Sequence, residues 1–214
     1  MPKLVDHDAR RMEIAEATWA ALQEIGIERL RLRDIADEVG FTTGVFAHYF
    51  RDKDSVLRYA FDLAYQRGAE RITEANRNTS SSLRQLRNAL VAIVPDKKHP
   101  ETLAFVSMCF GIRGINDPLL AADYKKKRKE YARSLKSHLS KAIAEGEIVA
   151  EQSVSDILDL LFATLDGVCI AALLNPTGFS KSRATRILDT MIERLSIGQS
   201  HLPNDEAAVS KQRV

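Results

Sequence analysis

The segment GFTTGVFAHYFRDKDSVL, residues 40–57, gathers side chains that are well suited to hold an anion. Thr42, Thr43, Tyr49 and Lys53 all donate hydrogen bonds of the kind that proteins make to phosphate oxygens. The two threonines stand at the expected start of a short helix, where free N–H groups and the helix dipole add positive potential. The segment therefore indicates a site for the phosphates of a nucleic acid.

Two short helices are expected to position these side chains. Ile35, Ala36 and Val39 recur at helical spacing up to Gly40, and residues 42–50 form the next helix. The small Ala36 lets two helices approach closely, and Gly40 suits the turn between them. This spacing is typical of a helix-turn-helix, whose second helix enters the DNA major groove, and also of an ordinary helical hairpin.

The residues after the turn separate these two interpretations, because the segment resembles the DNA-binding domain of TetR-family transcriptional regulators. The family's typical string is a glycine turn, Ser or Thr, a short helix ending in Tyr-Phe, then Lys and Leu. The matching residues here are Gly40, Thr42, Tyr49, Phe50, Lys53 and Leu57. The resemblance implies a DNA-binding transcriptional regulator.

The resemblance also implies roles for individual residues. Tyr49 and Lys53 would clamp phosphates, while the exposed face of the second short helix would contact base edges. A solvent-exposed helix histidine is the alternative reading of His48, and Val45 is expected to return to the core with its neighbour Phe46. Leu32 replaces the Thr that often caps the first short helix in the family. The expected DNA contacts are Arg33, Thr42, Thr43, Gly44, His48, Tyr49 and Lys53.

The charge of the chain does not favour a broadly basic surface. The sequence has 31 basic and 29 acidic residues, a formal net charge of +2. Residues 1–58 hold nine basic and eleven acidic residues, so their net charge is −2. Binding would rest on a few placed groups and on a basic arm around Lys3, Arg10 and Arg11. We therefore expect modest non-specific affinity and a moderate dependence on salt.

The predicted fold class is all-α. With 10 Gly and 6 Pro in 214 residues, chain breakers are scarce, and apolar residues recur at helical spacing almost throughout. About nine helices are expected, with no strand pattern of useful length. We expect a helix-turn-helix domain at residues 1–53, a helical effector-binding and dimerisation domain at 54–198, and a disordered tail at 199–214.

The helix expected at residues 157–174 is apolar all round, so it needs neighbours on two sides. Asp159 and Asp166 within it argue against a membrane span. With the amphipathic helix at 180–197, it would supply half of a four-helix interface between two copies of the chain. Two-fold symmetry would then present two recognition helices to a near-palindromic operator in double-stranded DNA.

Charged residues on the apolar stripes of this second domain need partners. Arg128 is either a snorkelling side chain or the partner of a buried carboxylate or a ligand. Asp166 either makes a structural hydrogen bond or salt bridge, or anchors a cationic or donor-rich effector. The cysteines are expected in the core. The predicted lining of an apolar effector cavity is Phe105, Met108, Cys109, Arg128, Phe162, Asp166 and Cys169.

The C-terminal half weakly resembles the choline- and betaine-responsive, BetI-type branch of the family. The resemblance lies in the MPKL start, in HYFRDK and in LDGVCIAALLNPTGFSKSRA. That branch typically has an aromatic residue where this chain has Cys169, so the resemblance leaves the effector unidentified.

The sequence thus predicts a cytoplasmic homodimeric repressor that a small-molecule effector releases from its operator. An effector-independent DNA-binding protein, with a solid C-terminal core, is the first alternative. An all-helical enzyme is the second, but the five histidines are scattered, and HExxH, phosphate-loop and GxSxG motifs are missing. We therefore expect no enzymatic activity, no cofactor and no metal site.

Overall fold

The computed structural model describes residues 6–95 and 103–197, and the predicted all-α fold is confirmed. The described residues contain no strand and form nine helices, as expected. Lys3 and the predicted tail at 199–214 lie outside them. The helices are α1 (His7–Arg29), α2 (Leu32–Glu38), α3 (Thr43–Tyr49), α4 (Lys53–Asn76), α5 (Ser82–Ile93), α6 (Leu103–Gly114), α7 (Pro118–Ala144), α8 (Val154–Leu174) and α9 (Lys181–Ile197).

The helix boundaries follow local sequence signals. At the start of α4, Ser55 N donates to the Asp52 carboxylate at 2.7 Å, and Asp52 N donates to Ser55 Oγ at 3.2 Å. At the start of α8, Asp156 N donates to Ser153 Oγ at 3.2 Å. These bonds satisfy N–H groups that the first helical turn leaves free. Within α1, Gly26 has φ 76 and kinks the helix, where the sequence predicts a stop.

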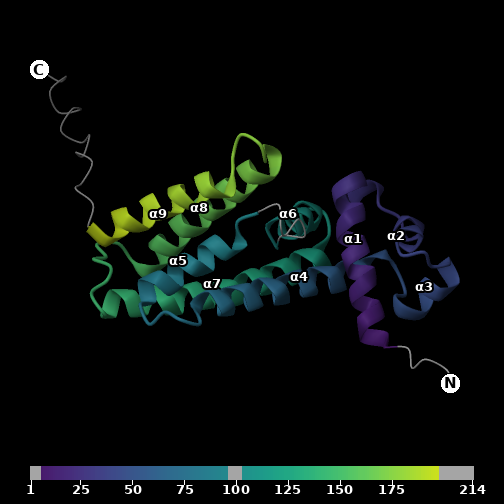
Figure 1. The fold of residues 1–214 in the computed structure, drawn as a ribbon, viewed down its shortest axis with the longest axis horizontal. Coiled ribbons are helices and arrows are strands. Elements are labelled where there is room, and N and C mark those ends of the chain that lie inside the picture. Colours follow the sequence, from purple (N-terminus) through teal and green to yellow (C-terminus); the bar gives the residue numbers. More distant parts are fainter. Residues whose placement is uncertain (1–5, 96–102, 198–214) are drawn as a thin grey trace, which may run out of the picture.

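The helices are arranged in two groups that share α4 (Figure 1). Helices α1, α2 and α3 lie at one end of the molecule, and α5, α7, α8 and α9 lie toward the other. The long α4 begins beside α1 and reaches the second group, where it packs on α5 and its Asp62 pairs with Lys127 of α7; α6 lies between the two groups. The helix that starts at the predicted domain boundary is therefore packed against both groups, and the boundary itself stays a prediction.

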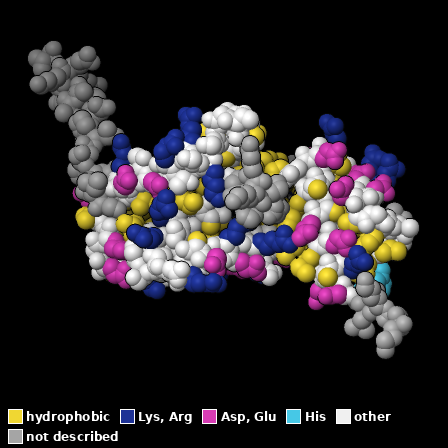
Figure 2. Space-filling model, viewed as in Figure 1, with side chains coloured by type: hydrophobic (Ala, Val, Ile, Leu, Met, Phe, Trp, Pro, Cys, Tyr) yellow, Lys and Arg dark blue, Asp and Glu magenta, His cyan; other side chains and the backbone are white. Residues whose placement is uncertain are grey.

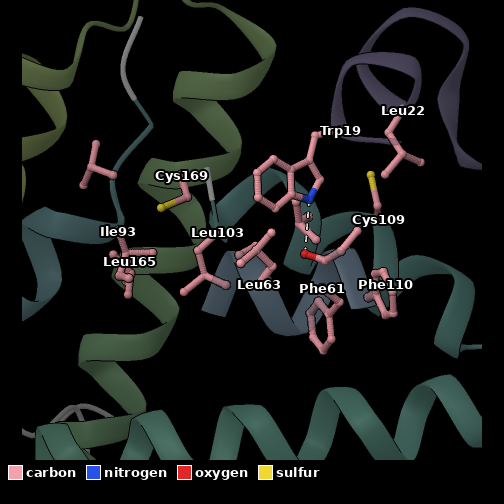
Figure 3. Close-up of a cluster of buried hydrophobic side chains, with 14 of the residues drawn as sticks. Trp19, Leu22, Phe61, Leu63, Ile93, Leu103, Cys109, Phe110, Leu165 and Cys169 are labelled. Atoms are coloured by element: carbon pink, nitrogen blue, oxygen red, sulfur yellow. Dashed lines mark hydrogen bonds between the residues drawn. The ribbon is translucent and has the colours of Figure 1, made fainter. Parts of the chain in front are cut away.

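Aromatic side chains fix α4 between α1 and α6. The Trp19 indole N–H donates to the carbonyl of Ala60 at 3.1 Å, and Phe61 stacks on Phe110 with ring centroids 4.1 Å apart (Figure 3). Both phenylalanines are almost completely buried. Because Ala60 and Phe61 are adjacent in α4, these two contacts join α1 and α6 to the same turn of one helix.

Helix α8 is long and apolar enough to cross a membrane by length and composition, but less than half of its apolar window is buried in this chain. Its buried side packs on α6, α7 and α9. Its other side leaves Leu160, Ile170 and Leu174 exposed, the last at 75%. A core helix of a soluble protein can have the same length and composition. The apolar character of α8 is therefore accounted for by its packing on three helices and by its uncovered apolar face.

We expect the Phe61→Ala substitution to lower the free energy of unfolding by about 3–5 kcal/mol, because it leaves a cavity against Phe110. Urea denaturation followed by circular dichroism would measure this loss. Leu119→Ala is the control, since Leu119 is 65% exposed and its truncation should change stability by less than about 0.5 kcal/mol. Equal effects of the two substitutions would contradict the role of the α4–α6 contact.

Candidate nucleic-acid interface and ligand cavity

The turn between α2 and α3 has the geometry of a helix-turn-helix. Gly40 takes φ 68, and the next residue, Phe41, donates its N–H to the Ala36 carbonyl at 2.8 Å. Thr42 then caps α3, because its hydroxyl accepts the N–H of Val45 at 3.3 Å. A left-handed glycine closes α2 and a side-chain cap opens α3, so the two helices follow each other with a short, defined turn.

The face of α3 that points to solvent carries Thr42, Gly44, Val45 and His48. The expectation that Val45 returns to the core is wrong, since its side chain is 45% exposed while Phe46 is 2% exposed. Successive helical residues point about 100° apart, and the side of α3 that faces the core is the side that carries Phe46. An exposed valine suits apolar contact with a thymine methyl group in the major groove.

Tyr49 lies at the end of α3 inside a cluster of rings. Its ring stacks on Phe41 with centroids 6.2 Å apart and lies 5.7 Å from His7 and 5.4 Å from His48. His7 belongs to the first turn of α1, and its exposed ring is 5.6 Å from His48. The start of α1 therefore adjoins the recognition helix, a placement that the local sequence pattern does not signal.

Lys53 and Arg33 occupy different surroundings. The Lys53 ammonium is half-buried and donates to the carbonyl of Ile27 at 2.8 Å. Burial lowers the pKa of Lys53, and the nearby Arg113 lowers it further. An ammonium has three donors, so this bond leaves two for a phosphate. Arg33 is exposed, with Nε 3.8 Å from the carboxylate of Asp34.

The start of α2 lacks the threonine that Leu32 replaces. Leu32 packs partly buried against the core, and the Asp34 carboxylate accepts the N–H of Arg31 at 2.8 Å. The residue before α2 is thus bonded to the first turn of the helix. No side chain accepts the N–H groups that open α2, and at position 32 an apolar side chain stands in place of a hydroxyl that could contact a phosphate.

The predicted basic arm is wrong for Arg10 and Arg11, which belong to α1. Arg10 pairs with Glu13 at 2.6 Å, and the Arg11 guanidinium lies about 5 Å from the rings of Phe50 and Tyr59. On the face shown in Figure 2, acidic side chains lie among the basic ones over the α1–α3 end. The interface thus offers individually placed donors instead of a continuous basic surface.

The second helix group encloses a cavity of about 260 Å³ between α4, α5, α6, α7 and α8. Met108, Arg128, Asp166 and Cys169 line it, as the sequence predicts. Most other lining residues are apolar, and some hydroxyls interrupt them. The remaining lining residues are Tyr65, Ile93, Leu103, Ala104, Ser107, Gly111, Ile112, Ile115, Tyr124, Tyr131, Leu165, Ile170 and Leu173.

Arg128 and Asp166 form a two-point ion pair across the cavity wall. Arg128 Nη1 and Nη2 donate to the two Asp166 carboxylate oxygens at 2.9 and 2.5 Å, joining α7 to α8. Among the described lining residues, these two carry the charges. Pairing with a carboxylate was one of the two readings of Arg128, and the structure selects it.

Phe105, Cys109 and Phe162 do not line the cavity. The ring of Phe162 stacks against Arg128, whose guanidinium carbon is 4.0 Å from the ring centroid. Phe162 therefore supports the ion pair without lining the cavity. Cys109 is buried on the opposite side of α6, and Figure 3 separates it from Cys169. Burial raises the pKa of Cys109 to about 11 and that of Cys169 to about 12, so both thiols are protonated and unreactive.

The sequence did not indicate the tyrosines of the cavity. Tyr65 comes from α4, and Tyr124 and Tyr131 come from α7. Burial raises the pKa of Tyr65 to about 12, and its hydroxyl lies 3.4 Å from that of Ser107. Tyr131 donates to the carbonyl of Ala89 at 3.0 Å. The walls therefore present apolar surface interrupted by hydroxyls, and that of Tyr65 remains neutral at physiological pH.

Comparison with known proteins accounts for both halves of the chain. Residues 14–60 match the family described as "Bacterial regulatory proteins, tetR family". Residues 82–196 match the family described as "BetI-type transcriptional repressor, C-terminal". Together the two matches contain the helix-turn-helix and almost all of the elements that enclose the cavity.

Relatives match the chain over nearly its full length. It is 28% identical to the HTH-type transcriptional regulator PksA of Bacillus subtilis, over 92% of this chain and 95% of that protein. It is 27% identical to BetI of Escherichia coli strain K12, over 96% of this chain and 100% of that protein.

Solved structures share the fold. A transcriptional regulator from Saccharomonospora viridis, solved in complex with choline, has a TM-score of 0.77 at 19% identity, over 87% of this chain and 96% of that one. The motif, the helix order and the two family matches agree. The chain belongs to the TetR family of DNA-binding transcriptional regulators and has a BetI-type C-terminal domain.

Proposed function

We propose that this regulator is a cytoplasmic homodimeric repressor that leaves its operator when a small molecule occupies the cavity between α4 and α8. The cavity of about 260 Å³ carries this proposal. An effector-independent DNA-binding protein would be expected to have a solid C-terminal core. The family evidence also points to a regulator and away from an enzyme.

On DNA, α3 enters the major groove, and residues of α3 and of its neighbours α2 and α4 make two kinds of contact. Tyr49, Lys53 and Thr42 hold phosphates and set the orientation of the helix. His48 and Thr43 read base edges, Gly44 permits close approach of the backbone, and Arg33 reaches a base or a phosphate. The exposure of His48, Gly44 and Arg33 supports these roles. The side chain of Thr43 lies outside the described part, so its role rests on the resemblance.

The uncovered faces of α8 and α9 form the subunit interface. Leu160 and Ile170 on α8 and Ile187 on α9 are exposed apolar side chains, as an interface core requires. Gly167 lies on the exposed side of α8, where an added Cβ would meet no atom of this chain within 4 Å. This small residue lets a helix of the second copy pack closely.

A route from the cavity to DNA runs through α6. Met108 and Gly111 line the cavity, and Arg113, one half-turn further, donates to the Asp54 carboxylate at 3.0 Å. Asp54 adjoins Lys53, the proposed phosphate contact. A ligand that shifts α6 would thus change the position of the start of α4, favouring a dimer geometry that no longer matches the operator.

The relatives do not identify the effector of this chain. The S. viridis regulator was solved in complex with choline, but at 19% identity its similarity to this chain extends only to the fold. Gel shift of the purified protein on its own upstream region, with and without candidate effectors, tests the proposal. A shift that an effector reverses is expected, and failure to shift any local promoter fragment would count against an autoregulating repressor.

We expect Tyr49→Phe and Lys53→Ala to weaken binding to all DNA sequences alike, since phosphate contacts carry no sequence information. Lys53→Ala should also reduce the salt slope of log K by about 1. His48→Ala should alter sequence preference instead. Gel shifts on a randomised operator library at several salt concentrations would distinguish these effects.

Arg77→Ala is the matched control for these substitutions. Arg77 directly follows α4 at the end remote from α3, and its side chain is 70% exposed. Its removal should leave affinity, preference and salt slope unchanged. A uniform loss on all DNAs for His48→Ala would remove the base-reading role from that residue.

We expect Gly167→Arg to yield a folded monomer with much weaker operator binding, because the long side chain blocks the partner helix but meets open space in this chain. Analytical ultracentrifugation would report the mass, and circular dichroism the fold. Gly167→Ala is the control, and it should remain dimeric. A Gly167→Arg protein that stays dimeric would place the subunit interface elsewhere.

A further inference from the structure

The charged lining of the cavity is an ion pair whose two members are held unequally. The Arg128 guanidinium rests on the ring of Phe162 at 4.0 Å, and its side chain is 29% exposed. The Asp166 side chain is 48% exposed, and the described contacts of its carboxylate are those with Arg128. Arg128 is therefore fixed in the wall, while Asp166 can turn toward water at small cost.

We propose that the effector is a small apolar carboxylic acid whose carboxylate replaces that of Asp166 on Arg128. This proposal rests on the proposed function, since it names the ligand class of the effector cavity. A carboxylate fits the planar guanidinium with two parallel hydrogen bonds, as Asp166 does. The released Asp166 is hydrated, and no buried charge is left without a partner.

A cationic effector fits this site less well. To reach Asp166, an ammonium group must take the place of Arg128, because the guanidinium already engages both carboxylate oxygens. Arg128 would then remain against Phe162 without an acceptor, and an unpaired charge in partly apolar surroundings is costly. The ion pair thus disfavours the alternative in which Asp166 anchors a cationic or donor-rich effector, and it favours an anion.

The rest of the cavity indicates the body of the acid. Its walls are mainly aliphatic and aromatic, and Ser107 on α6 and Tyr65 on α4 add hydroxyls to them. The volume of about 260 Å³ is slightly below the usual range for ligand pockets, which begins near roughly 300 Å³. An aryl-substituted or short-chain aliphatic acid suits both the apolar walls and the small volume of the cavity.

Binding of such an acid is coupled to the contact between α7 and α8. Because the ligand and Asp166 compete for one guanidinium, the acid binds only when the bridge between these helices opens. The bridge therefore reduces the affinity of the wild-type protein for its own effector. Removing the competing carboxylate should increase that affinity.

Direct calorimetric titration of the full chain without DNA tests the inference. The probes are phenylacetate, phenylacetamide and phenethylamine, which share a ring and differ in the charge of the polar end. Phenylacetate is expected to bind the wild-type protein most tightly. Preferential binding of phenethylamine, or of choline as a second cation, would overturn the proposal.

Two substitutions predict changes of opposite sign for the two ligand charges. Asp166→Asn should tighten phenylacetate binding by about tenfold, because it removes the competitor and keeps the side-chain shape. Arg128→Met should abolish phenylacetate binding. For a cation held by Asp166, the first variant would lose binding and the second would gain it. Absence of phenylacetate binding to both wild type and Asp166→Asn would also overturn the proposal.

Asp189→Asn is the matched control. Asp189 on α9 forms a similar two-point pair with Arg87 on α5, at 2.6 and 2.9 Å, and lies outside the cavity lining. This variant should leave phenylacetate affinity unchanged. Circular dichroism would confirm that each variant is folded, and Asp166→Asn alone decides the matter if Arg128→Met does not fold.

Gel shift with phenylacetate then separates this inference from the proposed function. If phenylacetate binds as expected but leaves the operator complex intact, the carboxylate site is supported and the proposed release of DNA by an effector in this cavity is contradicted. If only cations bind and release DNA, effector release stands and the carboxylate site is overturned.

Discussion

The packing of α4 against both α1 and α6 is the contact on which the rest of the structure depends. Phe61, stacked on Phe110, and Ala60, whose carbonyl accepts the Trp19 N–H, hold three helices together at adjacent positions of one helix. Lys53 lies at the start of α4 and Tyr65 lines the cavity, about 18 Å apart along the helix axis at 1.5 Å per residue. One continuous helix therefore joins the proposed phosphate contact to the wall of the cavity.

The near-neutral charge of the chain means that DNA binding cannot depend on a broadly basic surface. The first 58 residues have a net charge of −2, and several of their arginines are engaged with carboxylates or rings. Long-range attraction is then weak, and the proposed phosphate contacts must come from donors such as Lys53 that are partly committed to the fold. The bond to the Ile27 carbonyl fixes the position of the Lys53 ammonium, so its two remaining donors can reach only a phosphate that lies in the right place.

The sequence allowed the helices and their ends to be predicted because those signals are local. The caps at Asp52 and Ser153 and the kink at Gly26 depend on neighbours within a few positions. The orientation of Val45 and the side of α6 that carries Cys109 depend instead on rotations of about 100° per residue against distant helices. The cavity is harder still, because Tyr65 comes from α4 and becomes a neighbour of Asp166 only through packing of elements far apart in the sequence.

The partial exposure of the Arg128–Asp166 pair is what suits it to exchange its acceptor. A fully buried pair would be held by the high cost of separating charges in a medium of low dielectric constant, and no ligand of moderate affinity could open it. A fully exposed pair would contribute little and would exclude no water from a competing ligand. With Arg128 at 29% exposure and Asp166 at 48%, the guanidinium is desolvated enough to bind an acid strongly. The displaced carboxylate still reaches solvent, so the pair can act as a reversible link between α7 and α8.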